Sequence, residues 1–162
     1  MEATGRIAAV NGNMIAVAFD GAVAQNEVGF AELGTEGEDT RRLMCEVVRI
    51  RGGQADMQVF EDTTGLRIGD TVAFSGNLLP VELGPGLLGQ IYDGLQNPLP
   101  RLAEQCGFFL QRGTYLKALP RGTAWKFTPR VKAGDRLTAA ETLGTVPEGI
   151  FEHRIMVPFT LR

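Results

Sequence analysis

Histidine and cysteine are scarce in this sequence of 162 residues. His153 is the single histidine, and the two cysteines, Cys45 and Cys106, lie far apart in the chain. A histidine-based metal cluster needs several imidazoles, and cysteine metal sites use closely spaced pairs, so we expect neither kind of site. Two free thiols are the simpler interpretation of the cysteines, and one disulfide between them stays open at this stage.

Long apolar runs and an excess of positive charge are also missing. No uninterrupted apolar stretch reaches the roughly 20 residues of a transmembrane helix. Residues 1–6 lack the apolar core of a secretory signal. The formal net charge is −3, so no basic footprint favours nucleic acid or anionic lipid. We expect a soluble, cytoplasmic chain whose link to a membrane is indirect and made through partner proteins.

A phosphate-binding loop is absent as well, because the sequence contains no G-x-x-x-x-G-K-[ST] motif. The glycine-rich run at residues 84–89 has no lysine, and Pro85 offers no backbone N–H to a phosphate. We therefore interpret this run as a structural connector in which glycine supplies backbone freedom.

Glycine and proline are abundant instead, at 21 and 8 residues. Frequent turns of this kind favour many short strands over long helices. Apolar runs at residues 7–10 and 14–19 are joined through Asn11-Gly12. This dipeptide tolerates positive φ at both positions, so it predicts a hairpin with a type I′ turn.

A second hairpin is predicted from residues 43–51 and 54–61, joined by Gly52-Gly53. We expect a positive φ at Gly53. Between the two hairpins, residues 34–42 are polar and contain glycine, which predicts an exposed loop.

Two turns, at residues 62–65 and 69–70, precede a further short strand at residues 71–74. Roughly six short strands with tight turns favour a small closed barrel, because closure removes exposed sheet edges. We assign residues 1–76 to this N-terminal β barrel.

Residues 77–122 are rich in glycine, proline and leucine, which indicates an ordered, packed connector rather than a flexible linker. One or two helical turns are expected at residues 101–106. Residues 123–162 return to strand-like patterns at 125–127, 131–135, 143–146 and 153–158. The sequence therefore predicts a mainly β protein.

The last segment predicts a second, smaller β unit with one shared core. It stops at Arg162 without a helix cap or polar tail, so we expect it to be truncated. The predicted core members are Trp125, Phe127, Leu137, Leu143, Val146, Ile155 and Val157.

Several long stretches resemble the catalytic A subunits of V/A-type rotary ATPases. They are residues 59–65 and 81–99, followed by residues 125–129, 144–148 and 153–158. The last three are similar to an insertion that distinguishes those A subunits. The residues that carry this signature are Glu61, Asp62, Gly65, Gly84, Pro85, Gly86, Gly89, Asp93, Gly94, Pro98, Trp125, Pro147, His153 and Pro158.

The resemblance implies a six-stranded barrel, a connector and a protruding bulge domain ahead of a nucleotide-binding domain. It implies a parent enzyme that couples ATP hydrolysis or synthesis to ion transport and uses Mg-ATP. Because the phosphate-binding loop is missing, we expect this fragment to be inactive alone, and we assign it no catalytic, cofactor or metal-binding residue.

The same resemblance implies an assembly role. The barrel would pack beside equivalent barrels of neighbouring A and B subunits in a ring. The bulge would face stator or regulatory subunits. The complex would be cytoplasmic and peripheral to the membrane, and no nucleic-acid partner is expected.

Two carboxylate pairs invite an acid/base interpretation, but their spacing argues against it. Glu61 and Asp62 are adjacent, so on a regular strand they point to opposite faces. Asp62 is better explained as a turn residue. We expect no catalysis from this pair or from Asp135 and Glu141. His153 is interpreted as a partly buried strand residue.

An alternative remains for residues 131–158, which resemble biotinyl and lipoyl carrier domains. Such carriers present a modifiable lysine at a hairpin turn, whereas residues 147–151 contain none. Lys132 is the nearest lysine and fits a strand edge. We expect a flattened β unit of this type without its cofactor chemistry, with Trp125 and Phe127 in its core or at a partner contact.

Overall fold

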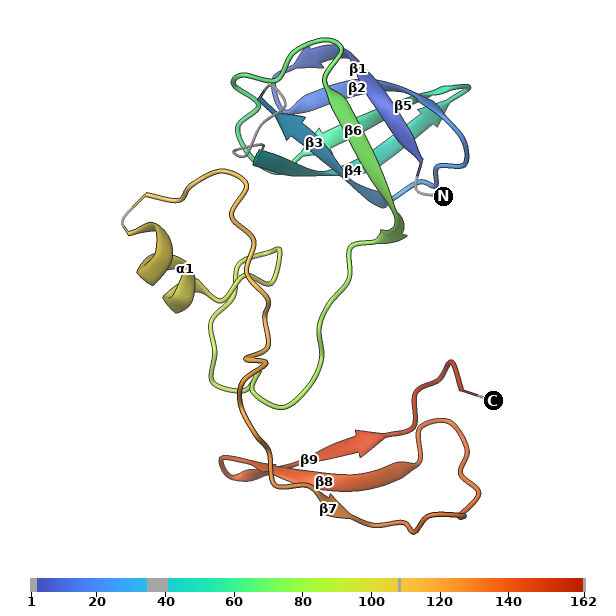
Figure 1. The fold of residues 1–162 in the computed structure, drawn as a ribbon, viewed down its shortest axis with the longest axis vertical. Helices are drawn as coiled ribbons and strands as arrows, with labels where there is room; N and C mark the ends of the chain where they lie inside the picture. The colour runs from blue at the N-terminus through green and yellow to red at the C-terminus, as the bar shows by residue number, and fades with distance from the viewer. Residues whose placement is uncertain (1–2, 35–40, 108, 162) are drawn as a thin grey trace. The chain divides into compact units, whose positions relative to one another are not determined.

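The computed structural model describes residues 3–34, 41–107 and 109–161. The chain divides into two compact units, which are described separately (Figure 1). The barrel unit contains the described residues up to 80 together with 109–115. The extension unit contains residues 81–107 and 116–161. The short return segment, residues 109–115, is called the strap.

Six antiparallel strands close into a barrel in the order β1-β2-β5-β4-β3-β6 (Figure 1). Because β1 pairs with both β2 and β6, the sheet has no free edge. This confirms the six-stranded barrel expected from the sequence. The strands are β1 (Thr4–Asn11), β2 (Met14–Asp20), β3 (Glu27–Leu33), β4 (Arg41–Arg51), β5 (Gln54–Val59) and β6 (Thr71–Leu78).

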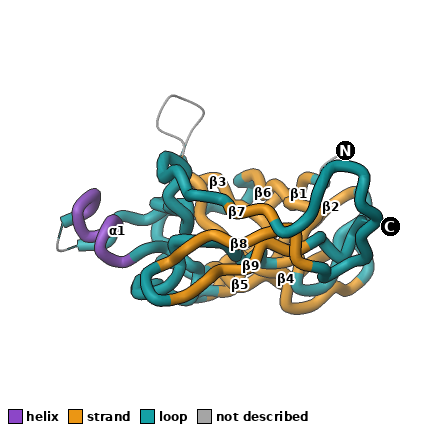
Figure 2. The backbone as a smooth tube through the Cα atoms, turned by 90° about the horizontal axis from the view of Figure 1, so that it is seen from below, coloured by secondary structure: helices purple, strands orange, loops and turns teal. Residues whose placement is uncertain are grey.

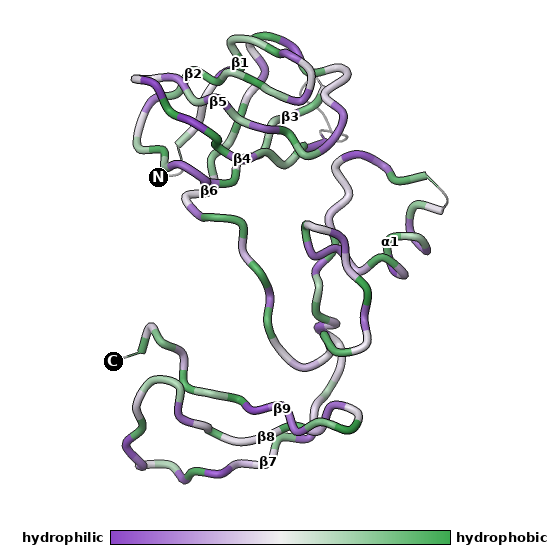
Figure 3. The backbone as a smooth tube through the Cα atoms, turned by 180° about the vertical axis from the view of Figure 1, so that it is seen from behind, coloured by the Kyte–Doolittle hydropathy of each residue, from purple (hydrophilic) through white to green (hydrophobic). Residues whose placement is uncertain are grey.

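Alternating apolar side chains fill the barrel. In β4, for example, Leu43, Cys45 and Val47 are buried, whereas the residues between them are partly exposed. Figure 3 shows hydrophobic and hydrophilic residues interleaved along the barrel strands. Phe74 is the largest fully buried side chain, and its ring meets Phe19 edge to face at a centroid distance of 5.7 Å. The period of two therefore produces one continuous core.

Both predicted hairpins form, but with a different turn geometry. β1 runs through Asn11, so Gly12 and Asn13 are the central residues of the first turn, and only Gly12 has a positive φ, 60°. In the second turn Gly52 has φ 58°, while Gly53 has a negative φ. Positive φ at the first central position alone is the type II′ pattern. The predicted type I′ turn and the predicted positive φ at Gly53 are therefore wrong.

β3 is a strand that the sequence pattern did not predict. Arg41 and Arg42, which were expected in an exposed loop, instead begin β4 and pair with Leu33 and Glu32 of β3. The strand ladder thus extends further than the polar residues indicated. The rest of that predicted loop, residues 35–40, lies outside the described residues.

The extension unit contains a three-stranded antiparallel sheet in the order β7-β8-β9. Figure 2 shows the helix α1 in purple, and α1 is the one helix in the described part of the chain. It confirms the helical turns predicted at residues 101–106 and begins two residues earlier. The elements are α1 (Leu99–Cys106), β7 (Thr128–Pro129), β8 (Thr142–Glu148) and β9 (Phe151–Met156).

Two strand predictions in the extension unit are wrong. Residues 125–127 and 131–135 contain no strand. The Lys132 amide donates to Asp135 Oδ2 at 2.8 Å, and the Asp135 amide returns a bond to the Lys132 carbonyl. Lys132 therefore lies in a turn and not at a strand edge. A local turn satisfies these amides, so they need no partner strand.

The predicted core of the extension unit forms only in part. Val146 is buried, whereas Phe127 remains 48% exposed. The Phe127 ring nevertheless covers Gly144, where a Cβ would lie 2.4 Å from the ring. The other predicted members are partly buried.

Cys45 and Cys106 are both free thiols. Burial raises the pKa of the Cys45 thiol to about 12. Within the described residues no helix is long and apolar enough to cross a membrane.

Candidate functional site: carboxylates that hold backbone amides

Glu61 follows β5 and binds the strap. Its carboxylate accepts hydrogen bonds from the Gly113 amide, at 3.0 and 3.2 Å, and from the Tyr115 hydroxyl at 2.6 Å. The same hydroxyl accepts a bond from the Met44 amide of β4 at 2.7 Å. Burial raises the pKa of Tyr115, and its hydrogen bond to Glu61 raises it further, so the phenol stays protonated. One carboxylate thus joins the strap to the barrel.

Asp62 points into its own turn instead. Its Oδ1 accepts bonds from the Thr64 amide at 2.9 Å and the Thr64 hydroxyl at 2.8 Å. These two bonds lower the pKa of Asp62, and the charge of Arg112 lowers it further. Glu61 and Asp62 therefore serve different partners.

Glu27, at the start of β3, is a third carboxylate of the barrel unit that binds backbone amides. No sequence pattern predicted this role. It is buried, with its Oε2 accepting from the Ala24 amide at 2.9 Å and its Oε1 from the Gly76 amide at 2.6 Å. Gly76 has φ 70°. Glu27 therefore fixes the irregular end of β6 to the start of β3.

Glu148, at the end of β8, is a buried carboxylate of the extension unit that also binds backbone amides. Its side chain is 7% exposed and accepts hydrogen bonds from the amides of Gly86 (2.6 Å) and Leu88 (3.1 Å). His153 Nδ1 lies 2.9 Å from Oε2 of the same carboxylate. Burial by itself raises the pKa of Glu148, but these three hydrogen bonds outweigh it, and the pKa lies below its ordinary value.

The segment from Asp93 to Pro98 folds into a tight polar loop. Asp93 Oδ1 accepts bonds from the amides of Leu95 (2.9 Å) and Asn97 (2.7 Å), and Oδ2 accepts from the Asn97 side chain (2.8 Å). Asn97 is buried, and its Oδ1 accepts from the Leu116 amide at 2.8 Å. The Asp93 side chain thus satisfies two amides of the loop, and the Asn97 side chain joins the loop to residue 116.

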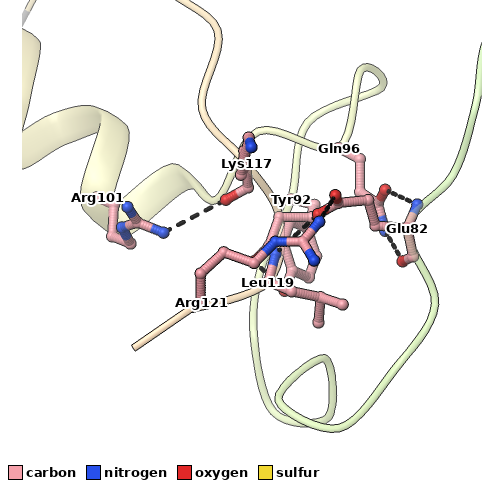
Figure 4. Close-up of polar contacts among 8 residues, drawn as sticks. Glu82, Tyr92, Gln96, Arg101, Lys117, Leu119 and Arg121 are labelled. Carbon is pink, nitrogen blue, oxygen red and sulfur yellow. Dashed lines mark hydrogen bonds and ion pairs between the residues drawn. The ribbon is translucent and has the colours of Figure 1, made fainter. Parts of the chain in front are cut away.

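Gln96 in this loop has φ 62°, a conformation that costs a non-glycine residue free energy. Figure 4 shows its side chain facing the backbone of Glu82. The Glu82 amide donates to Gln96 Oε1 at 2.7 Å, and Gln96 Nε2 donates to the Glu82 carbonyl at 2.8 Å. This two-way bond imitates a strand pairing. The Glu82 carboxylate in turn accepts from the Leu119 amide and forms an ion pair with Arg121 (Figure 4).

Two glycines of the signature, Gly84 and Gly86, lie where other chain segments come close. A Cβ on Gly84 would lie 3.0 Å from Leu119, and a Cβ on Gly86 would lie 3.2 Å from Pro120 and 3.5 Å from Trp125. Gly86 also has φ 105°. Any larger side chain at Gly86 would therefore be strained and would displace the Pro120 and Trp125 side chains.

The structure groups the remaining signature residues by unit. Glu61, Asp62 and Gly65 lie in the barrel unit, and the others lie in the extension unit. There His153 and Gly86 meet at Glu148, Asp93 and Pro98 belong to the polar loop, and Pro147 is an exposed residue of β8. A Cβ on Gly89 or on Gly94 would meet no described atom within 4 Å. Five residues whose side chains form these hydrogen bonds were not singled out from the sequence: Glu27, Glu82, Gln96, Tyr115 and Glu148.

The carboxylates of Asp135 and Glu141 also serve different partners. Asp135 closes the turn at Lys132, and Glu141 Oε2 accepts from the Thr138 amide at 2.6 Å. Among the described residues, no three histidine, cysteine, aspartate or glutamate side chains gather into a metal-binding group. The acidic groups named here have their oxygens bonded to donors of their own chain, which suits them to fixing loops.

Comparisons with known proteins cover both units. Residues 7–76 match the ATP synthase alpha/beta family, beta-barrel domain. Residues 116–162 match the ATP synthase alpha/beta subunit barrel-sandwich domain. The two matched ranges correspond to the barrel and to the part of the extension unit that carries its sheet.

Three similar proteins are V-type ATP synthase alpha chains. The chain is 59% identical over 157 residues to that of Treponema denticola, with 97% of the chain and 26% of the relative aligned. It is 56% identical to alpha chain 1 of Treponema pallidum, with 96% of the chain and 26% of the relative aligned. The Borrelia hermsii protein is 51% identical over the whole chain and 27% of its own length.

The chain therefore spans about a quarter of the length of these relatives. The order of its two matched domains agrees with the six-stranded barrel and the small three-stranded sheet of the structure. By these matches the chain belongs to the family of V-type ATP synthase alpha chains, of which it carries the N-terminal barrel and extension domains.

Proposed function

We propose that this chain is a non-catalytic assembly part of an ion-translocating rotary ATPase. In this proposal the barrel packs against barrels of neighbouring A and B subunits around a ring. The extension faces stator or regulatory subunits. The complex is cytoplasmic and attached to the membrane only through other subunits, and the parent subunit uses Mg-ATP.

The closed barrel is the observation that carries the proposal. Its interior is filled by side chains, and its edges are paired all the way round. A closed, packed barrel is stable without a partner strand and offers its outer faces for lateral contacts. A motor whose shaft turns inside a ring needs such a rigid collar, because the subunits must stay together while their catalytic parts change shape.

The side chains that bind backbone amides support the same proposal. Glu61 fixes the strap, Glu148 fixes residues 86 and 88, and Gln96 fixes the backbone of Glu82. These contacts stiffen the loops that they join. An assembly role requires rigidity of this kind, whereas phosphate chemistry requires the loop that the sequence lacks.

Deletions in the full-length alpha chain test the two halves of the proposal. Loss of residues 1–76 should reduce the yield of the assembled A/B ring, measured by native mass spectrometry, because neighbouring barrels lose their contacts. Loss of residues 123–162 should leave the ring intact and reduce stator binding. A ring that assembles equally well without the barrel would contradict the proposal.

Nucleotide binding gives a second test on the chain itself. We expect no saturable heat when Mg-ATP at about millimolar concentration, the weak-binding range, is titrated into it. Tight, stoichiometric binding in calorimetry would show that the assembly role is incomplete.

A further inference from the structure

A hollow of about 340 Å³ opens on the barrel unit and has no part in the carboxylate contacts of Glu27 or Glu61. A volume of this size accommodates a small ligand. Its lining includes two arginine residues. The residues around it are Leu33, Gly34, Thr64, Gly65, Arg67, Asp70 and Arg112.

Arg112 is held in place at the rim by neutral partners. Its Nη1 donates to the carbonyl of Asp62 at 3.0 Å and to that of Thr64 at 2.5 Å. A guanidinium has five N–H donors in a planar fork, so two bonds from one nitrogen leave the others to point elsewhere. The cost of ordering this long side chain is therefore already met before any ligand arrives.

Arg67 is positioned through its backbone. Its amide donates to Asp70 Oδ2 at 2.7 Å, and the Asp70 amide returns a bond to the Arg67 carbonyl at 3.1 Å. This closes a turn at the hollow, which Arg67 lines. Over the described ranges, neither Arg67 nor Arg112 forms an ion pair with a carboxylate.

In the described part of the lining, arginines outnumber acidic residues. Among the described residues of the lining, Asp70 is the single acidic one, and one of its oxygens already accepts the Arg67 amide. Asp62 lies near Arg112, but its carboxylate is bonded to Thr64 and it does not line the hollow. Two forked donors against one carboxylate favour a ligand with several oxygen acceptors and negative charge.

We propose that this hollow binds a compact oxyanion, a phosphate or a carboxylate, between the guanidinium groups of Arg67 and Arg112. The site lies on the barrel and does not depend on the assembly role proposed above. The shared chemistry is an anion with at least two oxygens that can accept from two guanidinium forks.

Nuclear magnetic resonance titration of the whole chain tests the site. Inorganic phosphate is added at neutral pH while sodium chloride is reduced to keep the ionic strength constant. We expect saturable amide shifts at residues 64–70 and 112–113. A parallel titration with acetate shows whether a carboxylate binds as phosphate does.

The variant Arg67→Gln should weaken binding about tenfold, since one charged hydrogen-bonding group is lost. This side chain makes no observed structural bond within the described residues, so the barrel should stay folded. Arg49→Gln removes an exposed arginine that pairs with Asp56 and should leave binding unchanged. Shifts that do not saturate, or that persist equally in Arg67→Gln, would overturn the proposal.

Discussion

The hydroxyl of Tyr115 lies 2.6 Å from Oε2 of Glu61, and the two residues are 54 positions apart in the chain. The same hydroxyl accepts the amide of Met44. A single oxygen therefore connects the strap to β4 and to the residues after β5. The ring of Tyr115 also packs edge to face against the ring of Phe30, at a centroid distance of 6.3 Å.

Replacing Tyr115 by phenylalanine should destabilise the barrel unit by about 1–2 kcal/mol, because Glu61 loses a donor and the Met44 amide loses an acceptor. Urea unfolding followed by circular dichroism measures the change. Tyr92→Phe is the matched control. Its hydroxyl makes one longer bond, 3.4 Å to the Ala118 carbonyl, and its removal should matter less. Equal losses in the two variants would show that the Tyr115 network is energetically unimportant.

The two glycines of the β4–β5 turn should respond differently to substitution. Gly52→Val forces a β-branched residue to φ 58°, at a cost of about 1–3 kcal/mol. Gly53 has a negative φ, and a Cβ there would meet only the Phe19 carbonyl, at 3.7 Å. Gly53→Val should therefore cost less. Thermal unfolding of both variants checks the order, and a larger loss at Gly53 would contradict the turn geometry.

Glu148→Gln should destabilise the extension unit at neutral pH by about 1–3 kcal/mol, the range for hydrogen bonds to a charged group. Trp125 is the single tryptophan and lies in this unit, so its fluorescence during urea unfolding reports on it. Glu152→Gln is the control, because Glu152 is exposed and its one ion pair among the described residues is with Arg130. A loss no larger than that of the control would rule out the proposed role of Glu148.

The effect of Glu148 should also depend on pH. Its pKa is lowered in the folded chain from an ordinary value of 4.5, so its stabilisation is present above that value and disappears as the pH falls through the lowered pKa. The difference between the natural chain and Glu148→Gln should therefore shrink in acid. A difference that stays constant to low pH would mean that the charge of Glu148 contributes nothing.

No lysine of the chain should be acylated by a biotin or lipoate ligase. The turn between β8 and β9 consists of Gly149 and Ile150, which carry no amine, and Lys132 is in a separate turn. Intact-mass measurement after co-expression with either ligase checks this. A stoichiometric mass gain would show that the extension unit is a carrier domain after all.

The barrel was largely predictable because its strands alternate apolar and polar residues and its hairpins are marked by glycine. β3 was not predicted because it begins with the buried polar Glu27 and has Gly29 as its third residue, so its apolar run is short. Asn26 before it has φ 65°, a local conformation that no periodic pattern shows. An alternating sequence pattern thus predicts only strands in which every second residue is a large, buried apolar side chain.

The extension unit was harder to predict for a related reason. Trp125 and Phe127 alternate as strand residues do, yet their segment is held by turns and by packing on Gly144 and Gly86. The bonds of Glu148 to residue 86 and of Gln96 to Glu82 join segments 62 and 14 positions apart. Such pairs depend on which loops meet in space, and that information is not contained in local periodicity.

The reactivity of the buried Cys45 thiol reports on how often the barrel opens. Only a thiolate attacks an alkylating reagent, and burial both shields this sulfur and raises its pKa to about 12. Cys106, at the end of α1, is partly exposed. A labelling time course on the unmodified chain therefore has two phases, the first set by simple access to α1 and the second by how often the barrel opens.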